Sequence, residues 1–300
     1  MKHFVMDAPN ALGFVVSQRS HIETEVLRKP YPEFKYAKLV PVDTSANPFA
    51  ASVTHFTQDA VGRAKIINGK GDDVPFVNIN GSKFEQMVNM GGVGYSFSME
   101  EIGAASQMGT NLSNEGAMAA RMAYEMLVDE MTLVGDAGLG IQGLFNTTGI
   151  TTIAAGATFA ASTPDTIIAA INGALSAIEV GTLGTQVANT IVLPLSVSAV
   201  MVRRLGDGSD VTIGDFVARA NAYTSRTGLP LTIEYSHRLT TSMVVYKRDP
   251  SVLKMHMPMP LQFIPPQFVN LEVKVLGMFR FAPVSIRMPT AMRYVTGVAV

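Results

Sequence analysis

Three glycines, Gly138, Gly140 and Gly143, form the Gly-x-Gly-x-x-Gly string that cradles a dinucleotide pyrophosphate in many enzymes. That chemistry needs a buried strand before the string and a helix after it, so that the phosphates meet a helix N-terminus. Here a long helical pattern precedes the string, and an uncharged run of Thr, Ala and Gly follows it. Asp165 lies at a suitable distance for a ribose but falls in the first turn of a helix. We therefore interpret the three glycines as a structural turn and expect no bound cofactor.

The remaining reactive side chains do not form a pattern typical of catalysis. The chain has no cysteine, which excludes disulfides, zinc–thiolate sites, iron–sulfur clusters and thiol catalysis. Asp207 and Asp210 could hold a cation across a loop, but carboxylates in such turns are usually solvated. The histidines are not within metal-ligand spacing of one another: His3, His21, His55, His237 and His256. We expect no catalytic residue and no metal site, and hence no enzymatic activity.

The composition indicates extensive burial against other chains. Hydrophobic residues make up 47% of the chain and charged residues only 16%, so a monomer would have few charges with which to cover its surface. The net charge of −1 predicts no strong attraction to nucleic acid or to an anionic membrane. The longest uncharged segment, 137–164, is too polar for a membrane span, and no secretory signal is visible.

The elements that would position the glycine turn are two consecutive helices. After a strand at 94–97, Ser98 and Glu101 form a capping box that starts a short helix reaching to about 107. A second helix is predicted over 113–134, and Gly135 supplies its left-handed stop. Its apolar stripe recurs at spacings of three and four: Ala120, Ala123, Leu127, Met131 and Val134.

A polar hairpin is predicted before these helices. A strand-like run ends at 66–67, turns through 68–73, returns over 74–79 and turns again at Asn80-Gly81. Such a two-stranded hairpin is marginal by itself and needs a surface to lie on. Charged side chains gather around it: Arg63, Lys65, Lys70, Asp72 and Asp73.

Beyond the glycine turn, short helices and strands alternate. A helix over 163–181 has an apolar face, and strands are predicted at 187–193, 231–235 and 243–246. Prolines at 258–266 interrupt regular structure, and alternating residues predict strands at 269–275 and 284–288.

This order of elements, together with the turn at 135–146, resembles the major capsid protein of tailed double-stranded DNA phages. That fold is shared with encapsulins and the herpesvirus capsid floor. The resemblance implies an α+β fold with four parts: an N-terminal arm (1–40), an extended loop and its base (41–92), a peripheral domain with a long spine helix (93–160 and 258–300), and an axial domain (161–257).

The resemblance also implies a function in assembly. Copies of the chain would form pentamers and hexamers of an icosahedral shell, built in the bacterial cytoplasm and found in the virion. The extended loop would lie on the adjacent subunit through the five charged residues named above. Scaffolding, decoration and portal proteins are the expected partners, with enclosed DNA bound without tight sequence specificity and no membrane. Two alternatives stay open: an encapsulin-type compartment shell, and a cytoplasmic α+β enzyme that uses the loop 138–143.

Overall fold

The computed structural model describes residues 31–66, 74–108 and 112–299, without the side chains of 106–108 and 112. The chain divides into two compact units, 1–33 and 34–300, and the fold described here is that of the second unit. Its helices and strands mix along the sequence, which confirms the predicted α+β class. Most of the expected arm lies outside the described residues.

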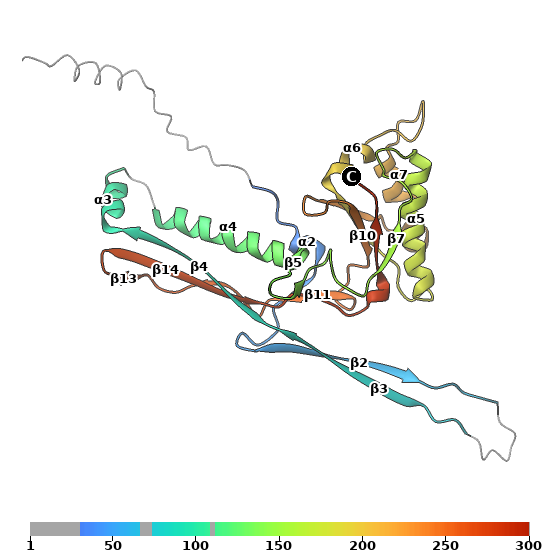
Figure 1. The fold of residues 1–300 in the computed structure, drawn as a ribbon, viewed down its shortest axis with the longest axis horizontal. Coiled ribbons are helices and arrows are strands. Elements are labelled where there is room, and N and C mark those ends of the chain that lie inside the picture. The colour runs from blue at the N-terminus through green and yellow to red at the C-terminus, as the bar shows by residue number, and fades with distance from the viewer. Residues whose placement is uncertain (1–30, 67–73, 109–111, 300) are drawn as a thin grey trace, which may run out of the picture. The chain divides into compact units, whose positions relative to one another are not determined.

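A long helix lying on a sheet forms the first layer (Figure 1). Strand β4 (Asn89–Ser98) pairs along its whole length with β14 (Glu272–Phe281), which also pairs with β12 (Met259–Phe263) and β13 (Gln267–Val269). Helices α3 (Met99–Met108) and α4 (Leu112–Leu133) follow β4, as the sequence predicted. Gly116 lets α4 approach closely, because a Cβ there would lie only 2.7 Å from Tyr95 and 2.8 Å from Phe97.

The capping box at the start of α3 is confirmed. The backbone N–H of Ser98 donates to Oε2 of Glu101 at 2.8 Å, and the N–H of Glu101 donates to Oγ of Ser98 at 3.2 Å. Gly135, immediately beyond α4, has the expected left-handed backbone with φ of +77°. It begins β5 (Gly135–Asp136), which pairs with β6 (Ile141–Gln142).

A five-stranded sheet forms the second layer. Its order is β7 (Thr151–Ala154), β16 (Met292–Thr296), β10 (Ser242–Tyr246), β8 (Thr190–Pro194) and β9 (Thr232–Ser236). Helix α5 (Pro164–Gly181) packs on it through the predicted apolar face, while η1 (Leu195–Val197), α6 (Ser198–Met201), α7 (Ile213–Arg219) and α8 (Ala222–Thr227) complete the block. This sheet combines strands from two of the predicted domains. Strands β7 and β16 belong to segments 93–160 and 258–300, and β16 pairs both with β7 and with β10 of segment 161–257.

Strand β10 contributes to both hydrophobic cores of the unit. Because successive side chains of a strand point to opposite faces, Val244 and Tyr246 enter the core beneath α4, and Met243 and Val245 enter the core beneath α5. The hydroxyl of Tyr246 donates to the carbonyl of Leu39 at 2.8 Å, which ties helix α2 (Tyr36–Leu39) to the first core.

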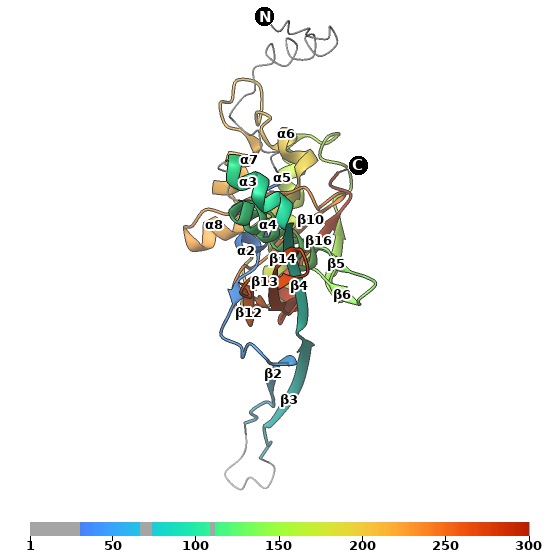
Figure 2. The same ribbon diagram turned by 90° about the vertical axis from the view of Figure 1, so that its left-hand side faces the viewer.

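A small three-stranded sheet lies next to the hairpin base. It consists of β1 (Val42–Asp43), β11 (Leu253–His256) and β15 (Val284–Ile286), followed by η2 (Pro289–Ala291). The hairpin itself consists of β2 (Ser52–Val61) and β3 (Asn78–Met87), which leave the rest of the unit together (Figures 1 and 2).

One predicted turn and one predicted strand are wrong. Asn80-Gly81 is not a turn but lies inside β3, opposite Asp59 and Gln58, because ten-residue β2 supplies a partner along the whole strand. The strand predicted over 269–275 is broken into β13 and β14 by a turn at Asn270, whose φ is +55°. Asparagine tolerates this left-handed conformation better than most residues. The alternating apolar residues of 269–275 therefore belong to two antiparallel strands on either side of a turn and not to one strand.

Candidate assembly surfaces

One face of the β2–β3 hairpin carries large apolar side chains that the described part of the chain leaves uncovered; Lys83 and Glu85 lie on the same face, which we call the apolar face. Phe56, Ile79 and Met87 point to this side of the hairpin, as the pairing register of the two strands requires. Phe56 and Ile79 are both 72% exposed, and Met87 is 66% exposed. Apolar side chains exposed along a two-stranded ribbon indicate a surface that another molecule covers.

The opposite face anchors the hairpin base to the three-stranded sheet. The ring of His55 stacks on that of Phe84, with centroids 5.3 Å apart and planes inclined by 15°. The side-chain amide of Gln86 donates to the carbonyl of Pro283 at 2.7 Å. Among the described residues, the contacts with the rest of the unit hold the hairpin at its base and not along its length.

Polar side chains of the three-stranded sheet face this base. The ammonium of Lys254 pairs with the carboxylate of Asp43, and Ser45 also donates to that carboxylate, which together hold its pKa well below the usual range. The Nδ1 of His256 lies 3.6 Å from the same carboxylate. Burial lowers the pKa of His256, and the nearby charge of Lys254 lowers it further.

The charged residues predicted to contact neighbours are only partly described. Arg63 and Lys65 lie in exposed chain beyond the paired part of β2. Lys70, Asp72 and Asp73 lie outside the described residues. Their role in contacts between subunits stays a prediction.

The three glycines have structural reasons for their positions. Gly140 has φ of +67°, and the N–H of Gly138 donates to the carboxylate of Asp136 at 2.7 Å. A Cβ on Gly143 would lie 2.5 Å from the backbone of Leu133, so the turn packs directly on the end of α4. The next helix begins only at Pro164. The turn therefore has no helix N-terminus close behind it to receive a pyrophosphate.

Two further apolar surfaces lie on the β4–β14 sheet. An open groove of about 610 Å³ lies on the face away from α4, where Gly92 and Gly94 form the floor and Met90, Leu276 and Met278 the sides. At the far end of the sheet, Phe268 is 72% exposed and Leu271 is 76% exposed.

The sequence does not indicate the burial of one charged residue on α4. Asp129 continues the surface series of Arg121 and Glu125 at a spacing of four, yet its side chain is only 1% exposed. It accepts hydrogen bonds from the backbone N–H groups of Lys35 at 2.8 Å and Tyr36 at 3.0 Å. Arg238, on the β9–β10 loop, donates to its second oxygen at 2.8 Å. Asp129 thus joins three segments that are far apart in the chain.

Two negative findings hold for the described residues. Their His, Asp and Glu side chains do not gather into a group of three that could hold a metal ion. Their helices include none that is both long and apolar enough to cross a membrane.

Comparison with known proteins gives a family and a fold. The model of a family described as major capsid protein matches residues 62–298. The fold is similar to that of the capsid of Myoviridae phage XM1, with a TM-score of 0.80, 20% identity and coverage of 99% of this chain and 100% of that one. A search of curated proteins finds no match.

Other solved structures share the fold at lower similarity. A protein of Mycobacterium phage Ogopogo has a TM-score of 0.63 at 15% identity, over 94% of this chain and 98% of that one. A virus-like particle from Pyrococcus furiosus has a TM-score of 0.52 at 14% identity, over 86% and 91% of the two chains.

Proposed function

The chain belongs to the major capsid protein family, and from that premise we propose that its copies form pentamers and hexamers of an icosahedral shell around packaged double-stranded DNA. As a member of this family, the protein is a structural subunit of a phage capsid shell. The family match favours this function over the encapsulin-type compartment and over an enzyme that uses the loop 138–143.

The observation that carries the proposal is the uncovered apolar face of the β2–β3 hairpin. Phe56, Ile79 and Met87 would lie in water on a monomer, where each exposed apolar side chain costs the free energy that burial would recover. A hairpin held only at its base is also well placed to reach a second copy. Its apolar face would supply the hydrophobic part of such a contact, and the charged residues Arg63, Lys65, Lys70, Asp72 and Asp73 its polar rim.

The parts of the chain receive corresponding roles in this proposal. Residues 1–40 would serve as the arm and 41–92 as the extended loop with its base. The α4 layer, within 93–160 and 258–300, would form the peripheral domain, and 161–257 would form the axial domain around the capsomer axis. Strand β16 links the last two parts, because it pairs with β10.

The shell would be assembled in the host cytoplasm and become part of the virion. Scaffolding, portal and decoration proteins are the proposed partners. The net charge of −1 supports a container that encloses DNA without binding it tightly, because strong nonspecific DNA binding needs a surplus of Lys and Arg.

The test removes the apolar face and leaves the fold intact. We expect Phe56→Ser combined with Ile79→Ser to keep the chain folded, because both side chains are exposed, and to prevent particle formation. Gln58→Ser, an exposed polar position on the same face, is the matched control and should assemble normally. Circular dichroism would report folding, and sedimentation with electron microscopy would report particles.

Three results would contradict the proposal in different ways. Normal particles from the double variant would show that this face is not an interface. Unfolding of the variant would show that the hairpin belongs to the core of its own chain. A wild-type chain that stays monomeric at high concentration and in every salt condition would contradict shell assembly itself.

A further inference from the structure

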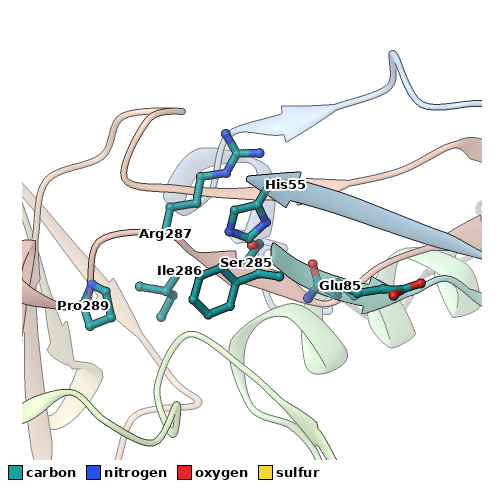
Figure 3. A pocket seen from close by; sticks show the side chains of 8 residues that line it. His55, Glu85, Ser285, Ile286, Arg287 and Pro289 are labelled. Atoms are coloured by element: carbon teal, nitrogen blue, oxygen red, sulfur yellow. The ribbon is translucent and has the colours of Figure 1, made fainter. Parts of the chain in front are cut away.

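A cavity of about 260 Å³ lies where the hairpin base meets the three-stranded sheet (Figure 3). We call it the hairpin-base cavity. Its walls come from three parts of the chain: His55 on β2, then Phe84, Glu85 and Gln86 on β3, and then Ser285, Ile286, Arg287 and Pro289 on β15 and just beyond. The hairpin and the sheet thus each contribute part of the wall of this partly open cavity.

Arg287 brings a positive charge to this cavity without a negative partner. Within 31–66, 74–108 and 112–299, the ion pairs of the structure leave Arg287 without a carboxylate. Its Nε atom is also buried without a hydrogen-bond partner. An unpaired buried donor on a charged group is costly, so its presence in a folded chain calls for a ligand.

The acidic residues nearest to the cavity are already engaged. Asp43 pairs with Lys254 and accepts two hydrogen bonds from Ser45. The carboxylate of Glu85 lies on the other face of the hairpin, where it accepts from Ser52 at 2.5 Å and pairs with Lys83 at 3.2 Å. Figure 3 shows it pointing away from Arg287.

The cavity therefore has a surplus of positive charge; the Oε1 atom of Gln86, an acceptor at its wall, is also buried without a hydrogen-bond partner. Burial lowers the pKa of His55, and the charges of Arg287 and Lys254 lower it further. The hydroxyl of Ser285 is a further donor at the wall.

We propose that the hairpin-base cavity binds an oxyanion through the guanidinium of Arg287, with His55 and Ser285 as additional donors. A planar guanidinium matches the paired oxygens of a phosphate, sulfate or carboxylate group, and charge-assisted hydrogen bonds of this kind are the strong ones. The oxyanion comes either from free phosphate or from an acidic side chain of a second copy. The second source rests on the proposed shell; the first does not.

The first experiment uses the full chain in its unassembled form, with sulfate as the probe. Titration calorimetry at constant ionic strength should give saturable binding with one site. Arg287→Met should weaken it at least ~10-fold, the loss expected when a charge-assisted pair is removed. Arg219→Met removes an exposed arginine on α7 with the same change of charge and should leave the affinity unchanged.

A second variant tests the same site in case Arg287→Met does not fold. His55→Phe retains an aromatic ring against Phe84 but removes a donor, and should weaken sulfate binding several-fold. The proposal is overturned if the wild-type chain shows no saturable binding, or if neither Arg287→Met nor His55→Phe changes the affinity.

The same titration on assembled particles distinguishes the two sources. Arg287-dependent binding to particles as well as to the unassembled chain would identify a free anion as the ligand. Binding to the unassembled chain alone would show that an acidic side chain of a neighbouring copy fills the cavity in the shell. The titration of the unassembled chain requires no shell. Its result would therefore still test anion binding by Arg287 if the chain proved not to assemble into particles.

Discussion

Replacing Asp129 by Asn tests whether one buried carboxylate holds three segments of the chain together. The substitution keeps the shape of the side chain and removes its charge. Its oxygen can still accept from the backbone N–H groups of Lys35 and Tyr36, but its NH₂ group then faces the Nε–H of Arg238, a donor against a donor. The variant therefore breaks the ion pair selectively.

The size of the effect follows from burial. Asp129 is 1% exposed and Arg238 is 16% exposed, so removing the carboxylate leaves a largely buried arginine without its main partner. Breaking such a pair costs about 3–5 kcal/mol. Because Glu130 remains 3.7 Å from Arg238, we expect the low end of this range, about 3 kcal/mol. Asp129→Ala should cost about 1 kcal/mol more, because it also removes the acceptor of the two backbone N–H groups.

Equilibrium unfolding of the unassembled chain in urea would measure these changes. The matched control is Glu130→Gln, one residue away on the same helix. Glu130 is 51% exposed and pairs with Arg238 only at 3.7 Å, so its loss should cost less than about 1 kcal/mol. If Asp129→Asn costs no more than Glu130→Gln, the carboxylate does not hold the segments together and the reasoning fails.

The remaining predictions concern the glycine turn and the buried histidine. Gly143→Ala should lower the free energy of unfolding by about 3 kcal/mol, because the new Cβ meets the backbone of Leu133; Gly140→Ala, with positive φ and open space, should cost only about 1 kcal/mol. Urea unfolding would measure both, and the reverse order would contradict this packing. The lowered pKa of His256 means that unfolding takes up a proton, so stability should fall as the pH drops below about 6.5. His256→Met should reduce that dependence, with the remainder contributed by His55, whose pKa is also lowered; an unchanged slope would refute the role of His256.

The sequence alone located the elements that depend on neighbours in the chain. The capping box of Ser98 and Glu101, helix α4 and the stop at Gly135 all lie within a few residues of the predicted places. Their hydrogen bonds join residues three or four apart, so the information that specifies them is local. One local detail differs: the helix predicted over 163–181 begins at Pro164, and the side chain of Thr163 makes no capping hydrogen bond.

Only the tertiary structure decided which distant segments meet. The sequence placed a turn at Asn80-Gly81, whereas β2 pairs straight through it. Alternation predicted one strand over 269–275, whereas the chain reverses at Asn270 so that both halves can pair. The burial of Asp129 and the unpaired guanidinium of Arg287 have no signature in the sequence, because each depends on side chains contributed from remote parts of the chain. Pairing register, burial and charge partnership are long-range properties, and residue spacing along one segment does not contain them.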